Sequence, residues 1–112
     1  MRIISGKLKG KKILFLKSST TRPLKDSVKE SIFNIISHSN LLNINLTSSS
    51  ILDLYSGIGS FGLECVSRGV KEVIFVEKNK AAAEVLISNL VKLKINNNAK
   101  VIVNDVKQFL NS

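Results

Sequence analysis

Cysteine, proline and aromatic residues are scarce in this sequence, and tryptophan is absent. The 112 residues include one cysteine and one proline, and aromatic residues make up 5%. Because Cys65 stands alone, no internal disulfide can form, which suits a reducing cytoplasm. No apolar run approaches the roughly 18–20 residues of a membrane span, and the one histidine, His38, has no Cys, Asp or His at ligand spacing. We therefore expect a cytoplasmic protein with no membrane partner and no bound metal.

Acidic residues are also few, and the basic residues gather at one end. The chain has 17 Lys and Arg against 8 Asp and Glu, a net charge of +9. Residues 1–30 hold nine of the cations and two of the acids, which gives +7 and leaves +2 for the other 82 residues. A basic end beside a nearly neutral body favours binding to a polyanion such as nucleic acid. A lysine-rich surface that merely solvates the chain is the alternative.

The first half of the chain is predicted to form a hairpin and a helix. Residues 1–17, MRIISGKLKGKKILFLK, place apolar residues among cations with Gly6 and Gly10 at turns, which predicts a short β-hairpin or a pair of edge strands. A helix is expected from Asp26 to about residue 38, and on it Lys25 and Lys29 lie one turn apart and can face one ligand. We therefore divide the chain into a basic unit at 1–38, a polar connection at 39–50 and a cofactor-binding unit at 51–112.

The second half alternates between strand and helix patterns. The 44% hydrophobic content suffices for a core of Ile, Leu and Val. Strands are predicted at 51–55, 73–76 and 100–104, and helices at 60–68, from the cap Asn79 to about residue 93, and from 106 onward. Such strand–helix units predict an α/β fold with a parallel sheet and right-handed crossovers.

A glycine-rich turn follows the first of these strands. Gly57, Gly59 and Gly62 match the pattern G-x-G-x-x-G between a strand and a helix, and Glu77 ends the next strand 20 residues after Gly57. The first glycine permits a tight turn, the second lets a ligand approach the backbone, and the third lets helix and strand pack closely. An acid at that place can bind ribose hydroxyls. The pattern fits both NAD and S-adenosylmethionine (SAM).

Asp53 favours SAM over NAD. It lies four residues before Gly57, at the carboxyl end of the first strand, where ligands of such folds bind. A carboxylate there would repel a pyrophosphate, whereas SAM brings a sulfonium and an ammonium, both cations. Asp105 ends the third strand in the same layer, placed to accept a hydrogen bond from an adenine amine. Three acids at three strand ends therefore predict a cationic nucleoside.

The sequence resembles a known family. DLYSGIGSFGLE at 53–64, VEKN at 76–79 and ND at 104–105 look like the SAM-binding half of class I methyltransferases, which have a Rossmann-like fold. RIISGKLKGKK at 2–12, TRP at 21–23 and VKESIFNI at 28–35 are similar to the RsmD-type small-subunit ribosomal RNA guanine-N2 methyltransferases. The likeness runs over essentially the whole chain. It implies SAM as cofactor and ribosomal RNA, or the small ribosomal subunit, as partner.

The resemblance also assigns residues. The cofactor would lie against Asp53, Tyr55, Gly57, Gly59, Glu77, Lys78 and Asp105. Within this set, Glu77 would hold the ribose and Asp105 would lie by the adenine. The RNA would contact Lys7, Lys9, Lys11, Lys12, Arg22, Lys25 and Lys29. Such contacts with phosphates position RNA without reading its sequence.

One part of the family pattern is missing. The family carries Asn or Asp, then Pro-Pro, then Tyr or Phe after a fourth strand, to hold the guanine amino group and stack on the flipped base. Here the single proline is Pro23, so no catalytic residue is assigned. We expect a fold truncated after the third parallel strand, with an exposed first strand that self-associates or is completed by another polypeptide. The alternatives are a non-enzymatic RNA-binding remnant of the fold and an NAD-binding fragment.

Overall fold

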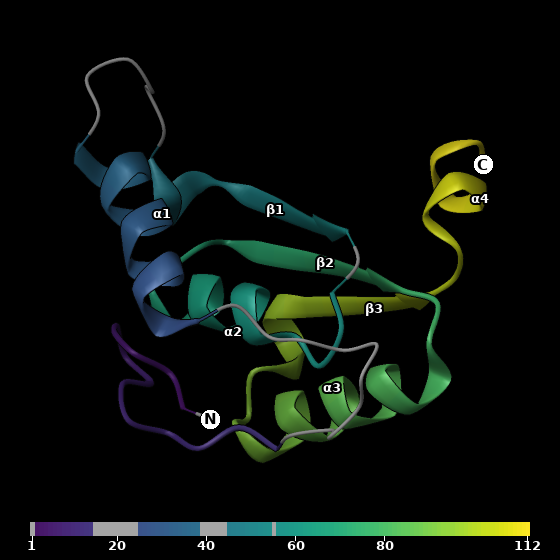
Figure 1. Ribbon diagram of the computed structural model, residues 1–112, viewed down its shortest axis with the longest axis horizontal. Coiled ribbons are helices and arrows are strands. Elements are labelled where there is room, and N and C mark those ends of the chain that lie inside the picture. Colours follow the sequence, from purple (N-terminus) through teal and green to yellow (C-terminus); the bar gives the residue numbers. More distant parts are fainter. Residues whose placement is uncertain (1, 15–24, 39–44, 55) are drawn as a thin grey trace.

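The computed structural model describes residues 2–14, 25–38, 45–54 and 56–112. A parallel sheet of three strands forms its centre, in the order β1-β2-β3 (Figure 1). Its strands are β1 (Ser50–Leu54), β2 (Glu72–Glu77) and β3 (Ala99–Val103). The helices are α1 (Asp26–His38), α2 (Ser60–Ser67), α3 (Lys80–Lys92) and α4 (Val106–Leu110), with short 3-10 turns at Leu46–Ser48 and Asn96–Asn98.

This architecture confirms the predicted α/β alternation, with each strand displaced by one residue or extended by one at each end. The helix starts follow from their caps. The side chain of Asn79 accepts a hydrogen bond from the backbone N–H of Ala82 at 3.0 Å, and that of Asp105 accepts one from Lys107 at 2.8 Å. These oxygens satisfy N–H groups that have no partner within the first turn of a helix.

The hydrophobic core lies between the sheet and helices α2 and α3. Val73 and Phe75 on β2 are fully buried, together with Leu63 of α2 and Leu86 of α3. Burying each such side chain contributes roughly 1.5–3 kcal/mol. The N-terminal part of the chain joins the same cluster of apolar side chains through Ile3, Ile13 and Phe33.

The predicted N-terminal hairpin is present in a short form within the described residues. One antiparallel bridge joins Arg2 and Lys12, the N–H of Ile3 donates to the Lys11 carbonyl at 2.9 Å, and the residues between them form turns. A ladder cannot extend because its backbone groups are engaged elsewhere: the N–H groups of Ile4 and Ser5 donate to the carboxylate of Glu64 at 2.9 and 3.0 Å. We call residues 2–14 the N-terminal loop.

Glu64 links three segments of the chain. Its carboxylate is fully buried, and besides the two loop amides it accepts a hydrogen bond from Arg68 Nε at 3.1 Å. The Nζ atom of Lys29, on α1, lies 3.7 Å away. The guanidinium of Arg68 covers the ring of Phe33, also on α1, with its Cζ atom 4.1 Å from the ring centroid. The N-terminal loop and α1 are therefore both attached to α2 at one carboxylate.

Strand β1 lies at an edge of the sheet. Within the described ranges it pairs with β2 alone, and the side chain of Leu52 is 47% exposed. The expected exposed first strand is thus confirmed. Among the described residues, the helices are all too short or too polar to cross a membrane.

We expect Glu64→Ala to lower the free energy of unfolding by about 3–5 kcal/mol, because it leaves the buried Lys29 ammonium and two loop amides without their partner. Urea denaturation followed by circular dichroism measures the change. Glu84→Ala, at an exposed position on α3, is the control and should shift stability by no more than about 0.5 kcal/mol. A loss below about 1 kcal/mol for Glu64→Ala would contradict the linking role.

Candidate cofactor site and basic surface

Three acidic side chains lie at the carboxyl edge of the sheet. Asp53 is in β1 opposite Phe75, Glu77 is the last residue of β2, and Asp105 follows β3 and begins α4. Because all three strands are parallel, their carboxyl ends meet at the same edge, where Figure 1 shows α4. The three acids therefore lie at the same edge of the sheet, and their grouping around a ligand stays a prediction.

Glu77 holds the glycine turn against β2. Its Oε1 accepts a hydrogen bond from the backbone N–H of Gly57 at 2.7 Å, and its Oε2 accepts one from Asn79 at 2.8 Å. Ser56 adds a second link, since its hydroxyl accepts a hydrogen bond from the N–H of Val76 at 3.1 Å. Each carboxylate oxygen has a second lone pair, so Glu77 retains acceptor capacity for a hydroxyl donor while it fixes the turn.

Two glycines are required for packing. A Cβ on Gly62 would lie 2.2 Å from the ring of Phe75, so helix α2 approaches β2 as closely as the pattern predicted. Gly59 has a φ of +91°, and its Cβ would lie 2.2 Å from a methyl carbon of Leu86 on α3. The side-chain direction at Gly59 is thus filled by Leu86 of a neighbouring helix, and the approach of a ligand to the Gly59 backbone stays a prediction.

Asp53 is the least satisfied acid of the edge. Its Oδ2 is buried and accepts no hydrogen bond from any residue that the structure describes. Burial raises the pKa of Asp53 to about 6, and the negative charge of Glu77 adds to the rise. The backbone N–H of Gly62 offsets part of this rise without reaching the geometry of a hydrogen bond to Oδ2. A cation bound nearby would supply the missing partner, and an anion would raise the pKa further.

The other predicted cofactor residues are less distinctive. Lys78 is exposed beside Glu77. Asp105 uses Oδ1 to cap α4, so only part of its carboxylate is available to a ligand. Tyr55 lies outside the described residues. Across the described ranges, no group of three or more His, Cys, Asp or Glu side chains is arranged to hold a metal ion. The thiol of Cys65 is buried, which raises its pKa to about 12 and makes it a packing residue.

The predicted RNA contacts divide into exposed and buried lysines. The exposed ones are Lys7, Lys9, Lys11, Lys12 and Lys25. Lys29 is a correction, because its side chain is fully buried and its Nζ donates a hydrogen bond to Ser60 at 3.2 Å beside Glu64. An ammonium in that position stabilises the carboxylate and cannot reach a phosphate. Arg22 lies outside the described residues.

The sequence prediction missed Asn89. This fully buried side chain accepts a hydrogen bond from the backbone N–H of Leu14 at 2.7 Å and donates to the Leu14 carbonyl at 3.2 Å. It also donates to the carbonyl of Ile58, within the glycine turn, at 3.3 Å. One amide thereby fixes the end of the N-terminal loop to α3 and to the turn. Its signal in the sequence was a polar residue between Leu86 and Leu90 on the apolar side of the helix.

The sheet, the glycine turn and the edge acids define a Rossmann-like fold of the methyltransferase type. The chain belongs to the family described as Conserved hypothetical protein 95, whose model matches residues 1–112. It is similar to the ribosomal RNA small subunit methyltransferase D of Haemophilus influenzae, with 38% identity over 93% of this chain, and to that of Escherichia coli, with 33% identity over 98%. The resemblance to RsmD-type proteins is thereby confirmed.

Solved structures agree with this assignment. The Escherichia coli protein yhhF, provisionally named a methyltransferase, superposes with a TM-score of 0.83 at 32% identity over 98% of this chain. A hypothetical protein of Thermus thermophilus superposes with a TM-score of 0.81 at 27% identity, also over 98%. The chain spans about half the length of its relatives: 51% and 52% of the two enzymes named above, and 55% and 58% of the two structures.

The pKa of Asp53 gives a stability prediction with a definite sign. Since the folded-state pKa of about 6 lies above the ordinary 3.8, the native state binds this proton more tightly than the unfolded chain does. The free energy of unfolding therefore falls as pH rises from about 4 to 6, by about 1–3 kcal/mol from this group. Asp53→Asn should remove that part of the slope and raise stability at pH 7. Urea titrations of both proteins at several pH values measure the difference, and parallel profiles would contradict the assignment.

Proposed function

We propose that this chain forms the SAM-binding and RNA-contacting part of a cytoplasmic methyltransferase that modifies guanine N2 of small-subunit ribosomal RNA. The names of the similar enzymes support the class of substrate. The main observation in favour of SAM as cofactor is the buried Oδ2 of Asp53, which has no hydrogen-bond donor among the described residues. This atom lies at the edge of the sheet that also holds the glycine turn.

The edge acids suit the chemistry of SAM. When bound, SAM supplies an electrophilic methyl group on a sulfonium. The Asp53 carboxylate would face a cation in place of the partner it lacks, and Glu77 would accept hydrogen bonds from ribose hydroxyls with its remaining lone pairs. Asp105 would accept from the adenine amine with the oxygen not used to cap α4. A pyrophosphate at the same edge would meet two carboxylates, which disfavours NAD.

The RNA would lie on the N-terminal loop. Exposed lysines at positions 7, 9, 11 and 12 can contact phosphates, which gives affinity and orientation but no choice of sequence. The choice of base requires groups that hold the guanine amine and stack on the ring. These 112 residues hold no Pro-Pro motif, so we propose that a further polypeptide segment with such groups supplies that step beside β1.

Titration calorimetry with SAM, S-adenosylhomocysteine and NAD tests the cofactor assignment. We expect SAM to bind and NAD to fail to displace it. Asp53→Asn should weaken SAM binding by about 10–100-fold, the value of a charge-assisted contact. Because SAM favours the ionised carboxylate, its affinity should rise as pH increases through about 6 in the parent chain and stay level in the variant.

Glu84→Gln removes one exposed carboxylate from α3 and serves as the control, with unchanged affinity expected. Tight NAD binding would overturn the argument from Asp53. A folded chain that binds RNA and no SAM would instead support the non-enzymatic remnant.

A further inference from the structure

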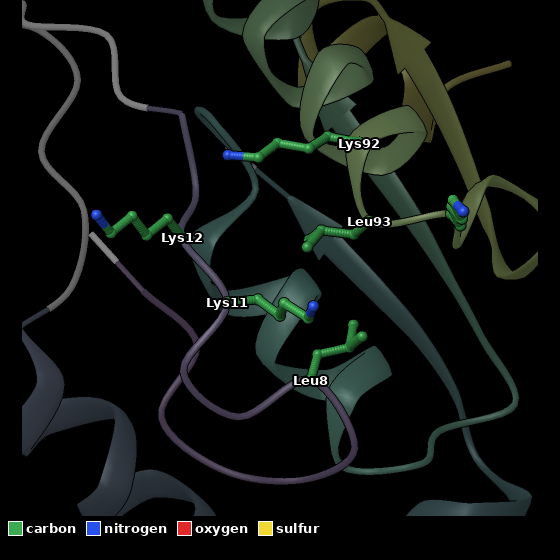
Figure 2. Close-up of a pocket in the computed structure, with 6 residues that line it drawn as sticks. Leu8, Lys11, Lys12, Lys92 and Leu93 are labelled. Carbon is green, nitrogen blue, oxygen red and sulfur yellow. The ribbon is translucent and has the colours of Figure 1, made fainter.

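A lysine-lined hollow lies between the N-terminal loop and the carboxyl end of α3. Its volume is about 430 Å³, and its lining consists of Leu8, Lys11, Lys12, Lys92, Leu93 and Lys94. Figure 2 shows Lys92 extending from α3 toward the loop that carries Leu8 and Lys11. Two of its four lysines, Lys92 at the end of α3 and Lys94 just after it, therefore lie far from the basic N-terminus in sequence.

The positive charge of this hollow is not neutralised by acidic side chains of the described residues. Its lining includes no carboxylate, and within the described part of the chain none of the four lysines forms an ion pair with Asp or Glu. The carboxyl end of α3 favours a cation, but a helix end carries only about half of one negative charge. Like charges held together repel one another, so this arrangement becomes favourable when an anion binds.

Lys94 lines the hollow in a strained backbone conformation. It follows the last turn of α3 with a φ of 57°, and the Ile95 N–H donates to the Leu90 carbonyl at 3.1 Å to close the helix end. Glycine is the usual residue at this left-handed position, because a side chain there is strained. The structure thus has a lysine in the lining of the hollow at a backbone conformation that glycine would adopt with less strain.

The hollow is also fixed relative to the cofactor edge. Asn89, one turn before Leu93, holds the backbone of Leu14 on one side and the carbonyl of Ile58 in the glycine turn on the other. Helix α3 is therefore bonded directly to the turn, and the loop is bonded to it through the same Asn89 amide.

We infer that this hollow binds the phosphate backbone of RNA, with Lys92 and Lys94 as contacts additional to the N-terminal lysines. A polyanion suits it better than a single small anion, because positive charge continues past it: Lys12 also lines a neighbouring hollow of about 670 Å³ with Arg2 and Gly10, where Asp26 is the one acid. Leu8 and Leu93 offer apolar surface to a sugar or base. The inference rests on the proposed RNA-binding function and extends it to α3.

The test is fluorescence anisotropy with a labelled RNA hairpin from small-subunit ribosomal RNA, titrated over a series of salt concentrations. Each phosphate contact contributes about 0.7–0.9 to the slope of log affinity against log salt. Replacing Lys92 and Lys94 with Gln should lower the slope by about 1.4–1.8 and the affinity roughly tenfold or more. The matched control replaces Lys100 and Lys107, exposed on β3 and α4, with Gln, which changes the net charge equally. It should change both quantities much less.

Lys94→Gly separates binding from folding. It should leave thermal stability unchanged or raised, because strain is relieved, and still lower the salt slope by about 0.7. Calorimetry with SAM should give parent-like affinity for all these variants.

Three results would overturn the inference. Equal losses in the Lys92/Lys94 variant and the control would mean that net charge alone acts, and the proposed function would stand. Displacement of the RNA by low concentrations of inorganic phosphate would indicate a small-anion site. If the parent chain bound SAM but no RNA, the RNA part of the proposed function would fail together with the inference.

Discussion

The buried carboxylate of Glu64 is the contact on which the arrangement of the first half of the chain depends. It accepts hydrogen bonds from Ile4 and Ser5, about 60 positions earlier in the chain, and it pairs with Lys29 and with Arg68, four positions later. A carboxylate without such partners would be very costly in a core. The acid therefore specifies one docking of the N-terminal loop and α1 on α2. The N-terminal loop, which carries the exposed lysines, keeps its shape because both oxygens of the buried Glu64 carboxylate have partners.

The strands, helices and edge acids could be predicted because their signals are local. Apolar strands separated by capped helices follow from periodicity, and the parallel order then brings Asp53, Glu77 and Asp105 to one edge without any knowledge of side-chain contacts. The shortness of the N-terminal pairing, a single bridge between Arg2 and Lys12, could not be predicted. Its alternating pattern is typical of strands, but Glu64 and Ser67 take the amides that a ladder needs, and they are distant in sequence.

Lys29 and Gly59 show the same limit within the site. Helical spacing correctly places Lys25 and Lys29 one turn apart, but spacing does not tell which face of α1 meets α2. It therefore predicts a surface cation at Lys29, where the structure has a buried ion pair. The glycine pattern likewise indicates where no side chain is tolerated, but it does not indicate which neighbouring group occupies the place of that side chain. At Gly59 it is Leu86. Asp53 and Glu77 look equivalent in sequence. In the structure, however, Glu77 accepts hydrogen bonds from backbone amides, whereas Oδ2 of Asp53 has no donor among the described residues.

The two halves of the proposed function require opposite charges. The edge with Asp53 and Glu77 favours a cation, whereas the loop and the end of α3 favour an anion. Two such surfaces in one small domain would weaken each other if they met, because each would neutralise the other. Asn89 joins the end of the N-terminal loop to the glycine turn through a neutral amide, because it bonds both Leu14 and the carbonyl of Ile58. Under the proposed function, one frame would hold a methyl donor at the acidic edge and a polyanion at the lysines.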